Sequence, residues 1–346
     1  MDVSGILGKW FDEHKRDLPW RKTNDPYKIW LSEIILQQTR VNQGIDYYNR
    51  FLLKFPTIDD LASTPIGEVL KVWQGLGYYT RARNIHIAAN TIVSEYKGMF
   101  PADFYSLRKL KGIGDYTAAA ISSIAFNQPY PVIDGNAYRV IARLFSIDLT
   151  LETAKGKKAF YDIAFKLLDK KNPGRHNQAI MELGATVCLP FNPKCSLCPV
   201  VSACTSFVNN STDRYPLKKR RVIQRDRYFN YLIIRKGDLI YMRQRKEGDI
   251  WAHLYEFPLI ETEKKMNPEN LFQLEAWKEM AGDNDYKVIH ISKEYKHQLT
   301  HQIIHARFIE IEVSSGFILE QSTEIAYNNI TDYPVSRLID KYLKDQ

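Results

Sequence analysis

The chain has 346 residues, 45% of them hydrophobic and 25% charged, which is enough for the cores of two domains. It has no apolar run of the roughly 18 residues a membrane helix needs, and its first 20 residues include four carboxylates and no long apolar segment. These features argue against a membrane protein and a secreted precursor. The net charge of +8 is compatible with a nucleic-acid partner. We expect a cytoplasmic monomer, associated with the nucleoid if the source is bacterial.

Residues 1–207 have mainly helical patterns, separated in most places by turns that contain Gly or Pro. The segment 25–38 begins with Asp-Pro, a helix cap followed by proline in the first turn. Further helical segments are 45–55, 66–74, 82–96, 116–126, 137–145, 154–168 and 178–188. We therefore predict a mainly α-helical domain over residues 1–207.

Glu33 is the only acidic residue between positions 27 and 39, in a run rich in Ile, Trp and Leu. On a helix it shares a face with Ile29, Trp30 and Leu36. Such surroundings disfavour the charged carboxylate and raise its pKa. A raised pKa suits a group that donates a proton near neutral pH. On its own, the residue could equally be a satisfied structural glutamate.

The segment 110–121, "LKGIGDYTAAAI", places Gly112 and Gly114 just before a predicted helix. Two glycines permit a tight turn whose backbone N–H groups can approach an anion, and the positive end of the helix dipole adds to the attraction. A DNA phosphate is a natural ligand for such a turn. An isolated turn of this kind is more often only a connector.

Asp134 precedes Gly135 and Asn136 at the start of another predicted helix, 20 residues after Gly114. The position alone is typical of a helix N-cap, which also favours the ionised carboxylate.

Four cysteines occur within 17 residues, with the spacing C-x6-C-x2-C-x5-C. Clustered cysteines in a chain without a signal peptide indicate a metal site. The site would hold either one Zn²⁺ or one [4Fe–4S] cluster. Only one close Cys pair is present, and this spacing after a helical domain favours iron–sulfur. The ligands would be Cys188, Cys195, Cys198 and Cys204.

Residues 208–227 are polar and then basic, with seven basic residues between Arg214 and Arg227, and we predict an exposed linker there. Strand patterns follow, including a hairpin around Gly237, with one helix at 271–280 and a closing helix at 336–343. Residues 228–346 are therefore predicted to form an α+β domain.

The cysteine spacing, the glycine turn and the segments "RDLPWR", "WLSEIILQQTRV" and "GLGYYTRAR" together resemble the MutY branch of the endonuclease III superfamily of DNA glycosylases. The resemblance spans residues 1–204. It implies a helix–hairpin–helix at about residues 105–125 and a [4Fe–4S] loop at 188–204 that supports DNA binding. The implied substrate is duplex DNA with adenine opposite 8-oxoguanine, and possible action on G:A mispairs follows from the same resemblance.

The resemblance also implies roles for individual residues. Glu33 becomes the catalytic acid and Asp134 the stabiliser of a cationic sugar, as in glycoside hydrolysis. Tyr116 and Asn136 support the sugar and Asp134. Tyr116 stands where strand-cleaving relatives have a lysine, and it cannot form their Schiff base. We therefore expect base removal without efficient strand cleavage.

Other positions match binding residues of the family. The adenine pocket would include Trp20, Arg21 and Glu182. The base must leave the duplex stack to reach it. The DNA contacts would include Gln38, Thr39, Leu76, Tyr78, Gly112 and Gly114.

The C-terminal domain resembles the Nudix-like lesion-recognition domain of the same proteins. The segment 249–261, "DIWAHLYEFPLIE", carries this resemblance, whereas the hydrolytic Nudix pattern is absent from the chain. A family loop of Phe-Ser-His that contacts the lesion corresponds here to Leu299, Thr300 and His301. Leu299 replaces the aromatic residue, so stacking on the lesion is not expected from it.

Three alternatives stay open on the sequence. The first is an endonuclease III-like glycosylase and lyase for oxidised pyrimidines, which Tyr116 and the C-terminal domain disfavour. The second is a non-catalytic iron–sulfur DNA-binding protein, in which Glu33 would be structural. The third is a Nudix pyrophosphohydrolase, disfavoured by the missing pattern.

Overall fold

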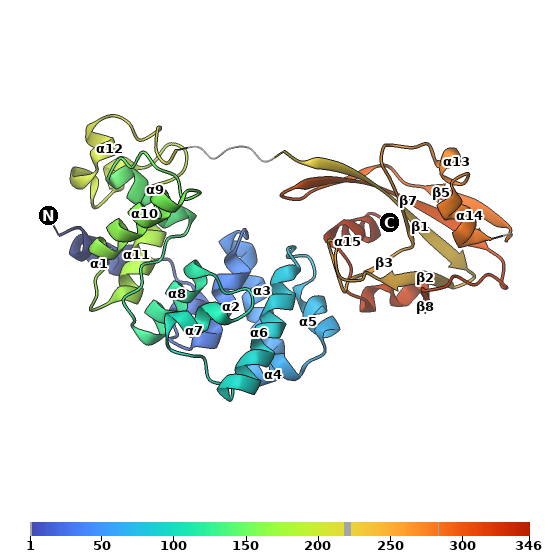
Figure 1. The fold of residues 1–346 in the computed structure, drawn as a ribbon, viewed down its shortest axis with the longest axis horizontal. Coiled ribbons are helices and arrows are strands. Elements are labelled where there is room, and N and C mark those ends of the chain that lie inside the picture. The colour runs from blue at the N-terminus through green and yellow to red at the C-terminus, as the bar shows by residue number, and fades with distance from the viewer. Residues whose placement is uncertain (1, 218–222, 283) are drawn as a thin grey trace. The chain divides into compact units, whose positions relative to one another are not determined.

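The computed structural model describes residues 2–217, 223–282 and 284–346. The chain divides into two units, Met1–Ser63 with Asn84–Arg220 and Thr64–Arg83 with Arg221–Gln346 (Figure 1). Residues 64–83, predicted within the helical domain, therefore group with the β-rich unit. Residues 218–222 of the predicted linker lie outside the described residues. No helix of the described part is long and apolar enough to cross a bilayer.

The first unit is helical, as predicted. Its elements are α1 (Val3–His14), α2 (Pro26–Leu36), α3 (Val41–Lys54), α4 (Ile58–Ser63), most of α6 (Thr80–Tyr96), α7 (Phe104–Lys109), α8 (Asp115–Phe126), α9 (Gly135–Leu144), α10 (Ala154–Leu167), α11 (Pro173–Thr186) and α12 (Thr205–Val208). The sequence patterns did not indicate α1, α4, α7 or α12.

Local chemistry explains where α2 begins and why it is buried. The Asp25 carboxylate accepts a hydrogen bond from the backbone N–H of Tyr27 at 2.9 Å, and Pro26 occupies the first turn. The residues from Ile29 to Ile35 are all buried, so α2 is covered on nearly every side. Full burial of each large apolar side chain stabilises the fold by about 1.5–3 kcal/mol. Glu33 is the single ionisable side chain in this buried stretch.

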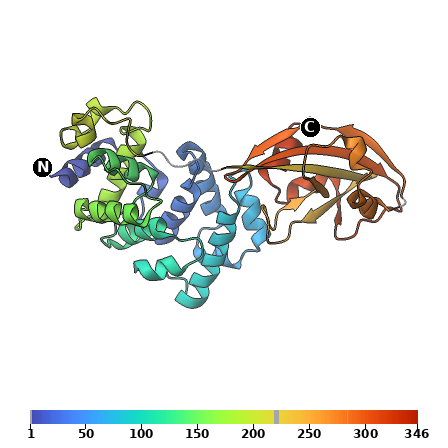
Figure 2. The ribbon, with the colours of Figure 1, turned by 45° about the horizontal axis from the view of Figure 1, so that its top comes forward.

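The second unit contains one mixed sheet. Among the described residues its eight strands are β1 (Arg225–Lys236), β2 (Leu239–Gln244), β3 (Tyr255–Glu256), β4 (Leu259–Thr262), β5 (Tyr286–Ile291), β6 (Tyr295–Gln298), β7 (Gln302–Val313) and β8 (Thr323–Ala326). The long strands β1 and β7 pair in parallel, with Arg225 opposite Gln302. Figure 2 shows the strands of this sheet side by side. The predicted hairpin is present, because β1 and β2 are antiparallel around Gly237.

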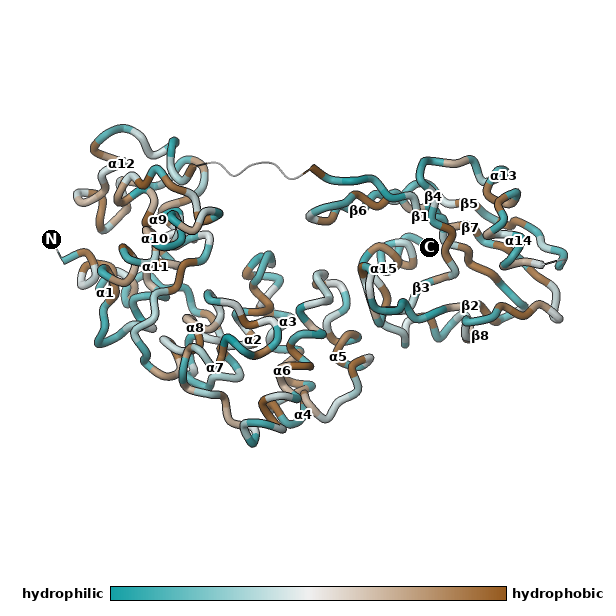
Figure 3. The backbone as a smooth tube through the Cα atoms, in the orientation of Figure 1, coloured by the Kyte–Doolittle hydropathy of each residue, from teal (hydrophilic) through white to brown (hydrophobic). Residues whose placement is uncertain are grey.

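Helices cover both faces of this sheet. Ile309 and Ile311 of β7 pack in one core with residues of α13 (Pro268–Leu271) and α14 (Glu275–Ala281). Figure 3 shows hydrophobic stretches along β7 beside these helices. Phe308 points to the opposite face, as alternation requires, and its ring stacks on Tyr342 of α15 (Arg337–Lys344) at 3.9 Å between centroids. The helix predicted over 271–280 is divided, since Leu274 has an extended backbone between α13 and α14.

The end of the predicted linker belongs to the sheet. Strand β1 begins at Arg225, and the Arg227 side chain, expected to be exposed, is only 8% exposed. Its guanidinium pairs with the carboxylates of Asp249 and Glu261, which offset the cost of its burial. The helix α5 (Ile66–Trp73) also belongs to this unit.

Candidate active site

A cavity of about 500 Å³ opens in the first unit between α2, α8, the start of α9 and α11. Nine of the residues singled out in the sequence line it: Trp20, Arg21, Glu33, Gln38, Thr39, Tyr116, Asp134, Asn136 and Glu182. Sequence reasoning gave no role to five polar or sulfur-containing residues that also line it: Arg16, Ser32, Gln37, Gln178 and Met181. The structure thus gathers side chains from positions up to about 160 residues apart in the chain.

Glu33 is 8% exposed and accepts a short hydrogen bond from the hydroxyl of Tyr116. Burial raises the pKa of Glu33 to about 7, and the nearby carboxylate of Asp134 adds to the rise, whereas the Tyr116 hydrogen bond and the charge of Arg21 oppose it. Near neutral pH a substantial fraction of Glu33 therefore carries a proton that it can donate.

Asp134 caps α9, as its place in the sequence predicts. Its Oδ1 accepts from the backbone N–H groups of Asn136 at 3.0 Å and Ala137 at 2.7 Å, and its Oδ2 accepts from the Asn136 side-chain amide at 2.9 Å. Burial raises the pKa of Asp134, and these three hydrogen bonds oppose that rise. A carboxyl group whose oxygens accept hydrogen bonds only from N–H groups is suited to the ionised form.

Arg139 fixes the orientation of Asn136. The guanidinium donates to Asn136 Oδ1 at 2.8 Å, which leaves the Asn136 amide nitrogen facing Asp134. The same guanidinium donates to the carbonyls of Gly184 and Cys188, both at 2.7 Å. A Cβ on Gly184 would lie 2.6 Å from the Cβ of Asn136, so a glycine is needed for α9 and α11 to approach this closely.

Glu182 holds two arginines at the other side of the cavity. Arg16 donates from its Nε and a terminal nitrogen to the two carboxylate oxygens at 2.8 and 2.7 Å, and Arg21 donates to Oε2 at 2.7 Å. Burial raises the pKa of Glu182, but the hydrogen bonds from both arginines outweigh it and bring the pKa down to about 2. Arg16 is therefore part of the site, and its place in "RDLPWR" was the only signal for it in the sequence.

The cavity offers no amine nucleophile. None of the residues that line it, within the described part of the chain, is a lysine. Burial raises the pKa of the Tyr116 phenol, so its hydroxyl keeps its proton and acts as a hydrogen-bond donor to Glu33. That Tyr116 forms no covalent imine stays a prediction.

The predicted helix–hairpin–helix consists of α7, the glycine turn and α8. Gly112 has φ +80°, and a Cβ there would lie 2.7 Å from the Cβ of Asn84, so both the backbone and the packing require glycine. Gly114 is the N-cap of α8. Both glycines are exposed, which leaves their side of the turn open to an anion.

The four cysteines meet in the loop after α11. All four line one pocket together with Arg143, whose guanidinium donates to Cys188 Sγ at 3.4 Å. Burial raises the pKa of the Cys198 thiol to about 11, whereas a bound metal deprotonates coordinating thiols outright. In the described residues, no three His, Cys, Asp or Glu side chains are placed to hold a single metal ion. The donor set of four thiols beside a guanidinium fits a thiolate-ligated cluster.

Two of the predicted DNA contacts, Leu76 and Tyr78, lie in the second unit. Leu76 is 5% exposed, whereas Tyr78 is 47% exposed with φ 50°. The hydroxyl of Tyr79 accepts from Gly75 N–H at 3.3 Å and donates to the Val335 carbonyl at 2.9 Å, which ties this loop to the end of the second unit. The cavity belongs to the other unit, and the DNA contacts of Leu76 and Tyr78 stay predictions.

The three predicted lesion-reading residues form the turn between β6 and β7. The backbone N–H of Leu299 donates to the Gln302 carbonyl at 2.8 Å and closes the turn. Thr300 and His301 are exposed, and Leu299 is half-buried. These residues form a tight turn between two strands, and their contact with the lesion stays a prediction.

Two family models match the chain. Residues 31–161 match the HhH-GPD superfamily base excision DNA repair protein, and residues 230–345 match the NUDIX domain. A solved thermostable thymine-DNA glycosylase is 28% identical and covers 60% of this chain and 95% of its own, with a TM-score of 0.55. With the two-carboxylate cavity, these matches define the class of the protein, which is a DNA N-glycosylase of base excision repair.

Relatives narrow the class further. The adenine DNA glycosylase of Buchnera aphidicola subsp. Acyrthosiphon pisum is 33% identical over 94% of this chain and 91% of the relative. That of Buchnera aphidicola subsp. Baizongia pistaciae is 34% identical over 98% of this chain and 96% of the relative. The chain belongs to the MutY-type family of adenine DNA glycosylases.

Proposed function

We propose that this protein removes adenine from duplex DNA by hydrolysis, where the adenine is mispaired with 8-oxoguanine or with guanine, and that it leaves the strand intact. The observation that carries the proposal is that a protonatable Glu33 and the helix-capping Asp134 line one cavity, and that no lysine is among its described lining residues. The adenine DNA glycosylase names of the relatives support the choice of base. The resemblance of the turn Leu299–His301 to the family's lesion-reading loop supports the mispair.

In the proposed reaction the flipped adenine enters the cavity and the bond between N9 and C1′ of the sugar breaks. Glu33 gives its proton to adenine N7, so the base leaves as a neutral molecule. Asp134 stabilises the positive charge that develops on the sugar. Water then adds to C1′ and its proton returns to Glu33, which restores the acid.

A labelled duplex with one 8-oxoguanine:adenine pair tests the proposal. We expect free adenine to be released, and alkali to be needed before the labelled strand breaks at the abasic site. Strand breakage without alkali, at the rate of base release, would instead indicate the lyase alternative. Absence of adenine release from folded, cluster-loaded protein would overturn the proposal.

The raised pKa of Glu33 predicts the pH dependence of the reaction. Because burial raises that pKa to about 7, the acid is protonated below this pH and loses its proton above it. The single-turnover rate of adenine release should be level at lower pH and fall about tenfold per unit above about pH 7. Single-turnover assays between pH 5.5 and 9, roughly the range that brackets this pKa, would measure it. A rate that stays constant to pH 9 would contradict the assignment of Glu33 as the acid.

We further propose that Cys188, Cys195, Cys198 and Cys204 hold a [4Fe–4S] cluster, which supports the loop and does not take part in bond cleavage. Replacing Cys198 with serine should lower the iron content and the absorbance shoulder at roughly 410 nm that thiolate-ligated iron gives. Elemental analysis of the purified wild type and variant measures this independently of activity. Stoichiometric zinc in the wild type, without that shoulder, would contradict the cluster.

A further inference from the structure

The turn Leu299–His301 is held by the residues that lead into β1. The side-chain amide nitrogen of Gln224 donates to the Leu299 carbonyl at 2.5 Å and to the Thr300 carbonyl at 3.4 Å. The next residue, Arg225, donates its backbone N–H to the His301 carbonyl at 3.1 Å. All three carbonyls of the turn are therefore engaged by two consecutive residues.

Gln224 is itself fixed from the other side. Its side-chain oxygen accepts from the amide nitrogen of Gln298, the last residue of β6, at 3.0 Å. The Gln224 amide thus joins the end of β6 to the turn and uses its oxygen and its nitrogen to do so. A glutamine is well suited to this position, because it supplies both an acceptor and two N–H donors.

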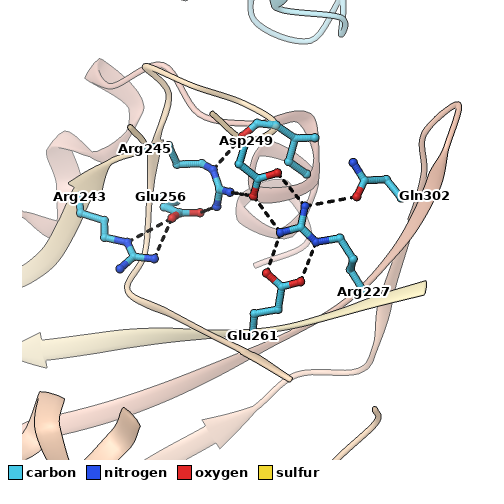
Figure 4. Close-up of polar contacts among 8 residues, drawn as sticks. Arg227, Arg243, Arg245, Asp249, Glu256, Glu261 and Gln302 are labelled. Carbon is cyan, nitrogen blue, oxygen red and sulfur yellow. Dashed lines mark hydrogen bonds and ion pairs between the residues drawn. The ribbon is translucent and has the colours of Figure 1, made fainter. Parts of the chain in front are cut away.

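The base of the turn rests on an ion-pair chain, shown in Figure 4. Arg227 donates to the side-chain oxygen of Gln302 at 3.2 Å, directly after the turn. The guanidinium of Arg227 is held by paired contacts to Asp249 at 2.8 Å and to Glu261 at 2.6 and 2.7 Å. Bidentate contacts of this kind fix the guanidinium plane. The start of β1 is therefore a rigid support, and the side chain of Gln224, directly before it, reaches two of the three turn carbonyls.

We propose that Gln224 is a positioning residue for lesion recognition, in that it holds the turn in the conformation that presents Thr300 and His301 to 8-oxoguanine. This inference rests on the proposed function, because it assumes that the turn reads the lesion. The residue lies in the segment that the sequence pattern indicated only as a linker. Gln224 belongs to the second unit, whereas the residues that line the catalytic cavity belong to the first. It is therefore proposed to act on mispair preference and not on bond cleavage.

The experiment compares full-length wild type with Gln224→Ala and Gln224→Glu. The glutamate keeps the size and the acceptor oxygen of glutamine but has no N–H donor for the two carbonyls. The matched control is Gln244→Ala, since Gln244 also donates to a backbone carbonyl of the second unit, that of His253 at 3.0 Å. Two readouts are taken, namely single-turnover adenine release from 8-oxoguanine:A and G:A duplexes, and amide hydrogen exchange of the peptide that contains Leu299.

In both Gln224 variants, the rate on 8-oxoguanine:A duplexes divided by the rate on G:A duplexes should fall about fivefold. This is the effect expected when one ordering hydrogen bond is lost. The rate on G:A duplexes should stay within about twofold of wild type, and exchange of the Leu299 amide should become faster. The control should change neither quantity.

The two readouts separate the inference from the function on which it rests. Unchanged exchange of the Leu299 amide in both variants would overturn the positioning role of Gln224. Faster exchange with an unchanged rate ratio would overturn the link between the turn and the lesion. A wild type without any preference for 8-oxoguanine would refute the lesion-reading part of the proposed function, and with it this inference, whatever the exchange data show.

Discussion

Replacing Glu33 with glutamine is expected to lower the single-turnover rate of adenine release by about 10²- to 10⁴-fold, the usual contribution of a positioned general acid. The amide has nearly the same shape but carries no transferable proton. It can still accept the hydrogen bond from Tyr116 through its oxygen. Affinity for the duplex should be unchanged, because the DNA contacts assigned to the glycine hairpin are untouched. Quenched-flow release assays and a binding titration measure the two quantities.

A stability measurement shows whether the variant is folded. The raised pKa of Glu33 means that its ionisation is disfavoured in the folded state, so the wild type loses stability as pH rises from about 4.5 to about 7. Glutamine stays neutral, and the variant should be at least as stable as wild type at pH 8. The matched control is Glu95→Gln on the exposed side of α6, which should alter neither rate nor stability. Normal release by a folded Glu33→Gln protein would remove Glu33 from the mechanism.

Replacing Asp134 with asparagine should lower the release rate by about 10²- to 10³-fold, because the negative charge that would stabilise the cationic sugar is lost. The helix start should survive, since asparagine caps helices about as well as aspartate and its oxygen can still accept from the N–H groups of Asn136 and Ala137. The new amide would face the Asn136 amide, at a cost of about 1–2 kcal/mol in stability. Thermal unfolding and single-turnover release together measure both effects.

The control for this variant is the same substitution at another cap. Asp103 caps α7 by accepting from the backbone N–H of Ser106 at 2.8 Å and is exposed, so Asp103→Asn should leave adenine release unchanged. A folded Asp134→Asn protein that releases adenine at the wild-type rate would show that position 134 is only a cap.

Local signals in the sequence predicted the class of fold, because helix periodicity, caps and glycine turns located α2, α8 and α9. Most members of the cavity were predicted from the resemblance to the family. Of the two carboxylates, Glu33 was noticed from its own surroundings, whereas Asp134 alone indicated only a helix cap and the resemblance implied its second role. Glu33 is a charge in an apolar helix, and Asp134 is a cap that also faces the cavity. The structure brings these residues together, and their catalytic roles stay predictions.

What escaped sequence reasoning depends on partners distant in the chain. Arg16 was one basic residue in a short motif, and its contact with Glu182 crosses 166 positions. Arg227 counted as part of a basic run, because the carboxylates that allow its burial come from two other places in the chain, Asp249 in a loop and Glu261 in β4. Residues 64–83 have ordinary helical character, and nothing local indicates that they group with the second unit. Ion pairs between residues far apart in the chain produce no periodic pattern in the sequence.

The two buried glutamates that line the cavity differ widely in pKa. Between the pKa of about 2 for Glu182 and that of about 7 for Glu33, these two side chains are one negative charge and one neutral acid. Across that interval neither glutamate changes its charge. The ion pairs of Glu182 with Arg16 and Arg21 therefore stay in place when Glu33 loses its proton above about pH 7. The pKa of the proposed acid, Glu33, can thus change in evolution without a change in the charge of Glu182, although the two glutamates line the same cavity.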